Sequence, residues 1–228
     1  MNIIVTGASR GIGRELALHL ARQGGHRIIL IARDEEKLKK ICEGDPYTLI
    51  PLPVDLENCD YDELGKKIRA LMPEVNVLVN NAGSMIKKNF GNFTATDFDH
   101  IMHVNVRSAM MLSQELLPIF ESGAHIVNIS SMGGYQGSVK FPGLSLYSAS
   151  KAALAVLSEC MALELSSYDV SVNCLALGSA RTEMLEEAFP GYEAPLKAEE
   201  MAAFIADFAL MGQKYFNGKV LPVSLSTP

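Results

Sequence analysis

A tyrosine and a lysine form the clearest candidate acid–base pair in the chain. In the segment YSASK, Tyr147 and Lys151 are four residues apart, so on a helix both side chains project from one face. A free phenol titrates at about pH 10, and a neighbouring ammonium stabilises the phenolate and lowers that pKa. We therefore predict that Tyr147 donates or accepts a proton while Lys151 stabilises its charge.

Two serines precede this pair and could act on the same substrate. Ser130 and Ser131 end the apolar segment HIVNISS. A hydroxyl at that point could hydrogen bond a substrate carbonyl and stabilise the charge that develops on its oxygen. The residue types favour chemistry on a carbonyl or an alcohol, and the spacing alone does not distinguish the two serines.

A glycine-rich segment near the start of the chain is typical of a dinucleotide site. TGASRGIG follows the first apolar run and precedes an amphipathic segment. Glycines let the main chain approach a pyrophosphate, and the amides and dipole at a helix start stabilise its negative charge. The cofactor contacts predicted from this segment are Gly7, Ser9, Arg10, Gly11, Ile12 and Gly13.

The residues after the second apolar run favour NADP(H) over NAD(H). An enzyme that prefers NAD usually places a carboxylate there to bind the ribose diol. Here Arg33, together with Arg10, could clamp a 2′-phosphate through two guanidinium groups. Asp34 is better explained as the N-cap of the following helix. The rival interpretation, in which Asp34 binds the ribose of NAD and Arg33 is a solvated charge, stays open.

Short β-branched runs alternate with longer amphipathic segments, which predicts parallel strands covered by helices on both faces. The expected strands are residues 2–6, 27–32, 48–54, 75–80, 125–130, 170–176 and 219–223. Together with the glycine-rich segment, this pattern predicts one α/β domain over residues 1–228. We expect a doubly wound Rossmann fold with a seven-stranded parallel sheet.

Two longer helices are expected over residues 95–120 and 146–167. They carry more apolar residues than one buried stripe needs, among them Met110, Met111, Met161 and Leu165. These side chains could face the sheet or a second subunit, because periodicity does not distinguish the two.

Composition and charge argue against several other classes of protein. The 228 residues carry a net charge of -6, which disfavours broad binding of nucleic acids or anionic membranes, since both repel an acidic surface. The four cysteines are far apart, with no histidine nearby at zinc-ligand spacing, so neither disulfides nor a metal site is expected. The start MNIIVTG leaves no room for a signal peptide, and no apolar stretch reaches the length of a membrane span. We expect a cytoplasmic protein.

The motifs, taken in order, resemble those of the classical short-chain dehydrogenases/reductases over almost the whole chain. The resemblance rests on TGASRGIG, on VDL at Asp55, on NNAG from Asn80 to Gly83, on Asn105 in HVNVRS, on ISS ending at Ser131, and on YSASK. It implies a hydride transfer between a nicotinamide cofactor and a carbonyl or alcohol substrate.

The resemblance also implies a role for individual residues. It makes Ser131 the catalytic serine and Tyr147 the general acid/base, with Lys151 also binding the nicotinamide ribose. Asn105 would hold a water that relays protons to Lys151. The remaining cofactor contacts that it implies are Asp55 and Leu56 at the adenine, Asn81, Ala82 and Gly83 along the adenosine and ribose, and Thr182 at the nicotinamide carboxamide.

The chain departs from the pattern of that family in several places. The segment between Ser131 and Tyr147 is a few residues longer than usual, so we expect an enlarged loop at the substrate mouth. Leu177-Gly178 stands where Pro-Gly is usual, which removes a rigid residue near the nicotinamide. The segment after Thr182 is short for a lid, and the tail SLSTP lacks the usual glycine-rich ending. We expect an open site or a small lid, and an altered subunit contact at the C-terminus.

The leading expectation is an NADP(H)-dependent enzyme that interconverts a small-molecule carbonyl and a secondary alcohol, assembled as a dimer or tetramer as relatives are.

A reductase of 3-oxoacyl thioesters shares every motif, but its acidic acyl-carrier partner would require a basic patch. Lys87, Lys88 and Arg107 are the candidates, and the alternative is that they are ordinary solvated charges. A non-catalytic NADP-binding sensor is disfavoured because the catalytic residues are retained. A nucleotide-sugar epimerase or dehydratase would need a larger C-terminal domain.

Overall fold

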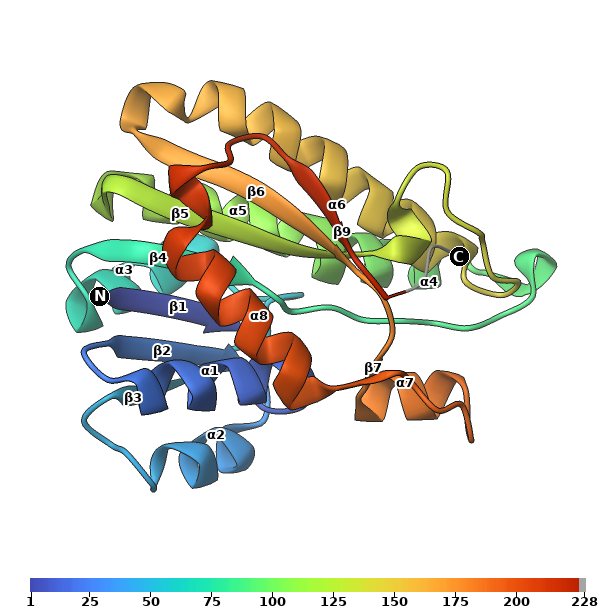
Figure 1. The fold of residues 1–228 in the computed structure, drawn as a ribbon, viewed down its shortest axis with the longest axis horizontal. Coiled ribbons are helices and arrows are strands. Elements are labelled where there is room, and N and C mark those ends of the chain that lie inside the picture. The colour runs from blue at the N-terminus through green and yellow to red at the C-terminus, as the bar shows by residue number, and fades with distance from the viewer. Residues whose placement is uncertain (226–228) are drawn as a thin grey trace.

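Parallel strands form the sheet at the centre of the structure, in the order β3-β2-β1-β4-β5-β6-β9 (Figure 1). The computed structural model describes residues 1–225. The end of the SLSTP tail, and with it part of the basis for an altered C-terminal subunit contact, lies outside the described residues. The strands are β1 (Asn2–Thr6), β2 (Arg27–Ala32), β3 (Leu49–Pro53), β4 (Val75–Asn80), β5 (Phe120–Ser131), β6 (Val170–Leu177) and β9 (Val220–Val223). The predicted seven-stranded, doubly wound sheet is confirmed.

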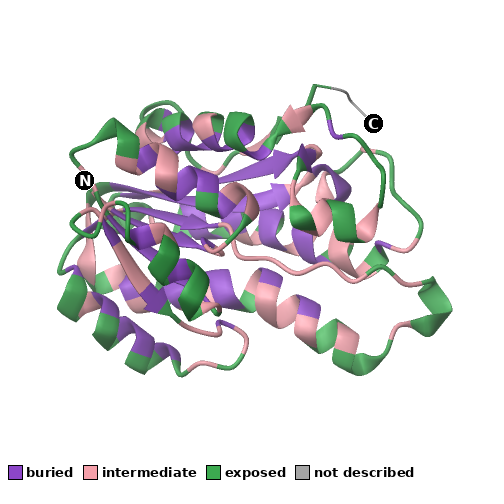
Figure 2. Cartoon of the chain, turned by 90° about the horizontal axis from the view of Figure 1, so that it is seen from below, coloured by how far each residue is buried: buried purple, intermediate pink, exposed green. Residues whose placement is uncertain are grey.

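Helices cover both faces of the sheet. One face packs against α1 (Gly11–Gln23), α2 (Glu35–Cys42) and α8 (Ala198–Met211), and the other against α3 (Tyr61–Leu71), α5 (Ser108–Leu116) and α6 (Ser145–Glu164). In β1, Ile3 and Val5 join the first apolar cluster, and Ile4 between them joins the second. This alternation follows from the two-residue period of a strand. Figure 2 shows the result, with buried strands between two partly exposed helical layers.

The segment expected as one helix over 95–120 is interrupted. α4 (Ala95–Met102) runs into a π-helical turn (His103–Arg107) before α5 begins, and β5 starts already at Phe120. α4 begins with a capping box, in which the Asp97 N–H donates to Thr94 Oγ1 at 3.1 Å. A π turn holds one residue more than an α turn, so hydrophobic periodicity gives little warning of it.

The apolar surplus of the two long segments divides between the sheet and the surface. Met161 lies in the cluster that packs on the sheet, with Met111 and Leu165 partly buried against it. Val156 and Leu163 on α6 are 59% and 80% exposed. By length and composition α6 could cross a membrane, but one side of it packs on the sheet, as in the core helix of a globular protein.

Outside the main sheet, the chain forms a small substructure after β6. β7 (Ala180–Arg181) pairs in parallel with β8 (Leu196–Lys197), and α7 (Glu183–Ala188) lies between them in sequence. In Figure 1 this substructure lies at the end of the molecule toward which the main strands point.

A buried polar cluster joins the end of α8 to the sheet. His125 of β5 is fully buried, and its Nδ1 and Nε2 lie 3.0 Å from Ala209 O and 3.0 Å from Asn173 Nδ2. Asn173 also donates to Phe216 O at 2.9 Å and accepts from the Lys219 N–H at 3.1 Å. Burial lowers the pKa of His125 from 6.5 to about 4, so the folded protein holds a neutral imidazole.

We predict that this histidine makes the free energy of unfolding fall as the solution is acidified. Because the pKa is lower in the folded chain, the unfolded chain binds the proton first as the pH falls below 6.5. The loss from this residue is about 2 kcal/mol between roughly pH 7 and pH 5. Urea unfolding of the wild type and His125→Gln at both pH values measures it. A variant with the same pH dependence as the wild type would contradict the assignment.

Candidate active site

The predicted catalytic residues meet where β5 ends and α6 begins. Ser131 is the last residue of β5, while Tyr147 and Lys151 lie on the first two turns of α6. Gly134 explains how the two elements approach each other, because a Cβ there would lie 2.5 Å from the Ala152 backbone nitrogen. The turn after β5 therefore rests directly on α6, and Ser131 faces the tyrosine.

Ser131 and Tyr147 interact directly. The Ser131 side chain hydrogen bonds to the phenol of Tyr147, and its Oγ also accepts from the Gly133 N–H at 3.1 Å. Burial of the phenol raises the pKa of Tyr147, and the bond to Ser131 opposes that rise without cancelling it. The net direction is opposite to the lowering that we expected from the neighbouring ammonium.

The ammonium of Lys151 is buried and anchored by a main-chain carbonyl. Its residue is 3% exposed, and Nζ donates to Ile129 O at 2.8 Å and lies 5.9 Å from the centre of the Tyr147 ring. Burial lowers the pKa of Lys151 to about 8, with Cys174 opposing the shift. The lysine can therefore exchange a proton near neutral pH, which an exposed lysine does rarely.

Asn105 lies in the π turn, 1% exposed, with its side chain fully engaged. Its Nδ2 donates to Ser84 O and to Ser150 Oγ, both at 2.9 Å, and its Oδ1 accepts from the Ser84 N–H at 2.7 Å. A Cβ on the preceding Gly83 would lie 3.3 Å from Lys151 Nζ and 3.5 Å from Asn105 Oδ1. The loop after β4 thus passes close to both catalytic groups, and the glycine permits that approach.

The glycine-rich loop has the geometry of a dinucleotide site. Gly7 and Gly11 have φ values of 66° and 53°, in the left-handed region that favours glycine. A Cβ on Gly13 would lie 2.4 Å from Gly7 O and from Asn81 Nδ2. The start of α1 is therefore pressed against the strand end, which leaves the first amides of the helix available to an anion.

One residue of this site was missed by the sequence reasoning. Thr6, at the end of β1, accepts through Oγ1 from the N–H groups of Asn81 and Ala82, at 3.0 and 2.9 Å. Asn81 Nδ2 returns a bond to Thr6 O at 2.9 Å. Thr6 therefore joins the glycine loop to the loop after β4. The sequence offered one sign of this role, because a residue with a hydroxyl directly precedes the first glycine.

The predicted contacts for the adenosine end lie on neighbouring loops. Arg33 is exposed directly after β2, and Asp34 is the N-cap of α2, accepting from the Lys37 N–H at 3.0 Å as expected. The carboxylate of Asp55 accepts from the Glu57 N–H at 3.1 Å and from Asn58 Nδ2 at 3.0 Å, and Leu56 is buried. Asp34 therefore has a structural role independent of any ribose.

α7 lies across the glycine loop. Thr182 caps α7 by accepting from the Leu185 N–H at 3.3 Å, and its methyl carbon would be 3.4 Å from a Cβ on Gly11. Arg10 pairs with Glu187 of α7, Nη1 to Oε1 at 2.9 Å. An open cleft of about 920 Å³ lies beside this contact. The short segment after Thr182 therefore forms one six-residue helix beside the glycine loop.

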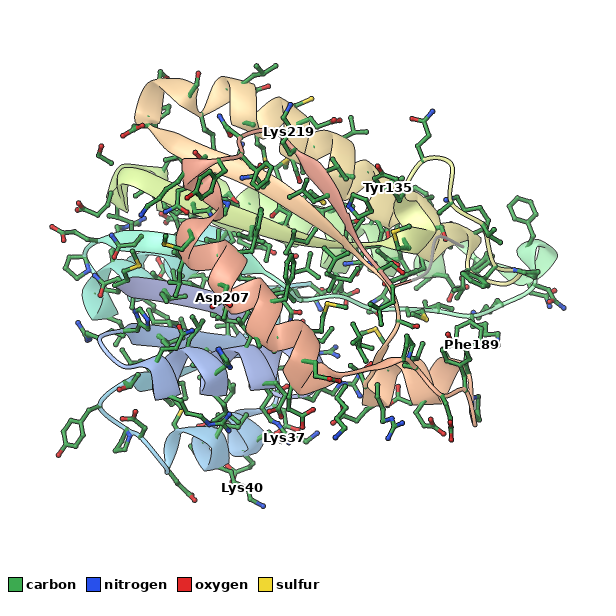
Figure 3. The ribbon with its side chains drawn as sticks, in the orientation of Figure 1. Lys37, Lys40, Tyr135, Phe189, Asp207 and Lys219 are labelled. Carbon is green, nitrogen blue, oxygen red and sulfur yellow. The ribbon has the colours of Figure 1, made fainter. Side chains whose placement is uncertain are left out.

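The other departures from the family pattern also have structural explanations. Gly178 lies so near Ser224 that a Cβ there would be 2.6 Å from its Oγ, which requires the retained glycine. The enlarged loop before Tyr147 is braced by Lys140 Nζ, which donates to Tyr135 O at 2.6 Å. Figure 3 places Tyr135 from this loop and Phe189 after α7 on the same side of the molecule, where the main strands end.

Among residues 1–225, no cluster of histidine, cysteine, aspartate or glutamate side chains has the geometry to hold a metal ion.

Fold and site together place the chain among the oxidoreductases that bind a nicotinamide dinucleotide on a doubly wound sheet. The family model described as short chain dehydrogenase matches residues 1–193, and the chain belongs to that family. It is 32% identical over 219 residues to the fatty acyl-CoA reductase of Acinetobacter baylyi, covering 91% of this chain and 72% of that protein.

Solved structures agree with this assignment. A short-chain dehydrogenase from Burkholderia cenocepacia in complex with NADP has a TM-score of 0.87 and 27% identity, with 97% of this chain and 95% of that chain covered. The 3-ketoacyl-(acyl-carrier-protein) reductase from Brucella melitensis, complexed with NADH, has a TM-score of 0.85 and 23% identity, with 97% and 96% covered. The second similarity supports the fold alone.

We predict that Gly134→Ala disturbs both stability and the site. The added methyl would overlap the backbone of α6 at Ala152, so the turn that carries Ser131 must move. The expected loss is about 1–3 kcal/mol in the free energy of unfolding. Urea unfolding measures it, with Gly91→Ala as the control, because a Cβ on Gly91 meets nothing within 4 Å. Equal effects of the two substitutions would contradict the tight contact.

Proposed function

We propose that the protein is an NADP(H)-dependent carbonyl reductase or alcohol dehydrogenase in which Tyr147 is the general acid/base. The observation that carries the proposal is the cluster of Ser131, Tyr147 and Lys151 at the mouth of the dinucleotide site, with the serine bonded to the phenol. We further propose one catalytic domain over residues 1–228, a cytoplasmic location and a homo-oligomer. The exposed Val156 and Leu163 on α6 support a subunit contact.

In this mechanism the residues position the substrate and move one proton. Ser131 Oγ hydrogen bonds the carbonyl oxygen, and the phenol of Tyr147 gives that oxygen its proton as the alcohol forms. Lys151 Nζ stabilises the resulting phenolate, in a site where the lysine is buried and the tyrosine is partly buried. When bound, the nicotinamide supplies the hydride.

The cofactor is proposed to lie along the loops described above. Gly7, Ser9, Gly11, Ile12 and Gly13 would face the pyrophosphate at the start of α1, and Asp55, Leu56, Asn81, Ala82 and Gly83 would line the adenosine and ribose. Thr182 and Lys151 would contact the nicotinamide end. Arg33, exposed directly after β2, and Arg10 in the glycine loop support NADP(H) over NAD(H), because two guanidinium groups could clamp a 2′-phosphate once Arg10 exchanges its partner Glu187 for the cofactor.

A second candidate function is reduction of the keto group of a 3-oxoacyl thioester. The fatty acyl-CoA reductase of Acinetobacter baylyi, which by its name acts on an acyl thioester, favours a substrate of this class. The contacts of the proposed basic patch argue against an acidic carrier protein. Lys88 pairs with Asp97 at 2.7 Å, Lys87 donates to Ala188 O at 2.8 Å, and Arg107 lies 5.8 Å from the centre of the Tyr61 ring. A non-catalytic sensor is less well supported, because the catalytic residues lie together.

We predict that Tyr147→Phe abolishes turnover and preserves cofactor binding. The wild type should oxidise NADPH with at least one compound in a screen of ketones, aldehydes, quinones and acetoacetyl thioesters. Loss of the phenol hydroxyl should lower kcat by at least about 100-fold. Tyr168→Phe, on an exposed tyrosine beyond the end of α6, is the control. Undiminished turnover in Tyr147→Phe would refute the mechanism.

We predict that Arg33→Ala discriminates between the two nicotinamide cofactors. Removal of a guanidinium that binds the 2′-phosphate should weaken NADPH binding by about tenfold or more and leave NADH binding almost unchanged. Fluorescence titration with both cofactors measures the effect, with Arg22→Ala in the last turn of α1 as the control. Equal losses for NADPH and NADH would refute the preference.

A further inference from the structure

A serine, a histidine and a glutamate form a hydrogen-bonded chain beside the catalytic residues. Ser84 Oγ lies 2.8 Å from His100 Nε2, and His100 Nδ1 lies 2.9 Å from Glu57 Oε1. The three residues come from the loop after β4, from α4 and from the loop after β3. None of them belongs to the catalytic or cofactor-binding set described above.

The inner end of this chain adjoins buried catalytic groups. Ser84 bonds Asn105 through both its main-chain N–H and its main-chain carbonyl. It directly follows Gly83, whose Cβ position lies 3.3 Å from Lys151 Nζ. Asn105 and Lys151 are 1% and 3% exposed, so the inner end of the chain lies against buried groups.

The outer end of the chain reaches water. The side chains of His100 and Glu57 are 28% and 21% exposed. With Glu57 accepting from Nδ1–H, the neutral ring accepts the Ser84 hydroxyl proton at Nε2. A ring protonated from solvent donates to both neighbours instead, which frees the hydroxyl proton of Ser84 to point inward.

We propose that Glu57, His100 and Ser84 conduct protons between solvent and the catalytic site, a role that rests on the function proposed above. Each carbonyl reduction removes one proton from Tyr147, and that proton must be replaced from water. Lys151 first gives a proton to the phenolate of Tyr147, which restores the phenol and leaves a neutral amine. The His100 Nε2–H bond then breaks as an O–H bond forms at Ser84, and the original Ser84 proton passes inward to the Lys151 amine. Alcohol oxidation reverses the sequence.

The same order of groups, a carboxylate, an imidazole and a serine hydroxyl, activates a serine for acyl transfer in hydrolases. Here the main-chain N–H of Ser84 is used by Asn105 Oδ1, and the serine adjoins the lysine and asparagine of a reductase. Proton transfer is therefore the assignment that the surroundings of Ser84 favour. Burial lowers the pKa of Lys151 to about 8, so the amine that remains after Lys151 has protonated Tyr147 takes up the incoming proton at neutral pH.

Other charged groups around His100 belong to the same local network. The groups on the elements packed against it are Glu57, Arg107, Asp97 with its partner Lys88, His103 and, on the inner side, Lys151. Arg107 donates to Glu57 O at 3.5 Å, so it contacts the main chain rather than the carboxylate. The carboxylate of Glu57 is the direct partner of the ring, with Oε1 2.9 Å from His100 Nδ1.

The test compares the wild type with His100→Gln and Ser84→Ala. The control is His103→Gln, which alters a second histidine one turn further along the same helical segment. The substrate is the compound reduced fastest in the screen, measured across neutral pH in H2O and D2O. His100→Gln and Ser84→Ala should lower kcat by about tenfold with little change in KM. Both should also show a larger solvent isotope effect, because proton delivery becomes limiting. Ser84→Ala keeps the main-chain hydrogen bonds to Asn105, so this variant still tests the proton route if His100→Gln does not fold.

Imidazole distinguishes proton conduction from a purely structural contact. Added to His100→Gly, imidazole should restore much of the lost kcat, with a pH profile that follows the titration of imidazole itself. No response to imidazole, together with a loss that is the same at every pH, would overturn the proton route alone. A wild type that reduces no compound in the screen would overturn the proposed function, and the proton route with it.

Discussion

The buried ammonium of Lys151 is the constraint around which the catalytic end of the molecule is arranged. A charge with 3% exposure is costly unless polar groups surround it, and here the Ile129 carbonyl accepts its proton at 2.8 Å. That carbonyl belongs to β5, while the lysine belongs to α6, so the contact fixes the helix against the strand. Gly83 and Gly134 then matter because each lets a loop approach the lysine more closely than a side chain would allow.

Much of the architecture could be predicted because it depends on local patterns. Buried strands such as β1 and β4 are nearly continuous in apolar character, and strands of that kind occur between two helical layers. Asp34 was correctly interpreted as an N-cap, since a carboxylate that opens a charged helix has a direct local partner. That a serine at the end of β5 would meet Tyr147 followed from the positions in the sequence, and the family resemblance selected Ser131 over Ser130.

The parts that could not be predicted depend on contacts between distant segments. The rise in the pKa of Tyr147 comes from burial, which no spacing of residues reveals. Thr6 joins two loops through hydrogen bonds that span more than 70 residues of sequence. The contact of Arg10 with Glu187 likewise requires α7 to fold back over the glycine loop. In each case the deciding partner lies far away in the sequence, so the local pattern alone did not reveal the contact.

The π turn at His103–Arg107 has a consequence for how this helical segment can vary. A π turn is equivalent to one extra residue inserted into an α-helix. Deleting a single residue there would convert the π turn into an α turn, and the residues beyond it would keep their direction, because the wider turn absorbs the extra residue. Leu112 and Leu116 would stay on the sheet, while the side chains within the turn, Asn105 among them, would shift. The extra residue therefore sets the position of Asn105 without altering the packing of the helix that follows.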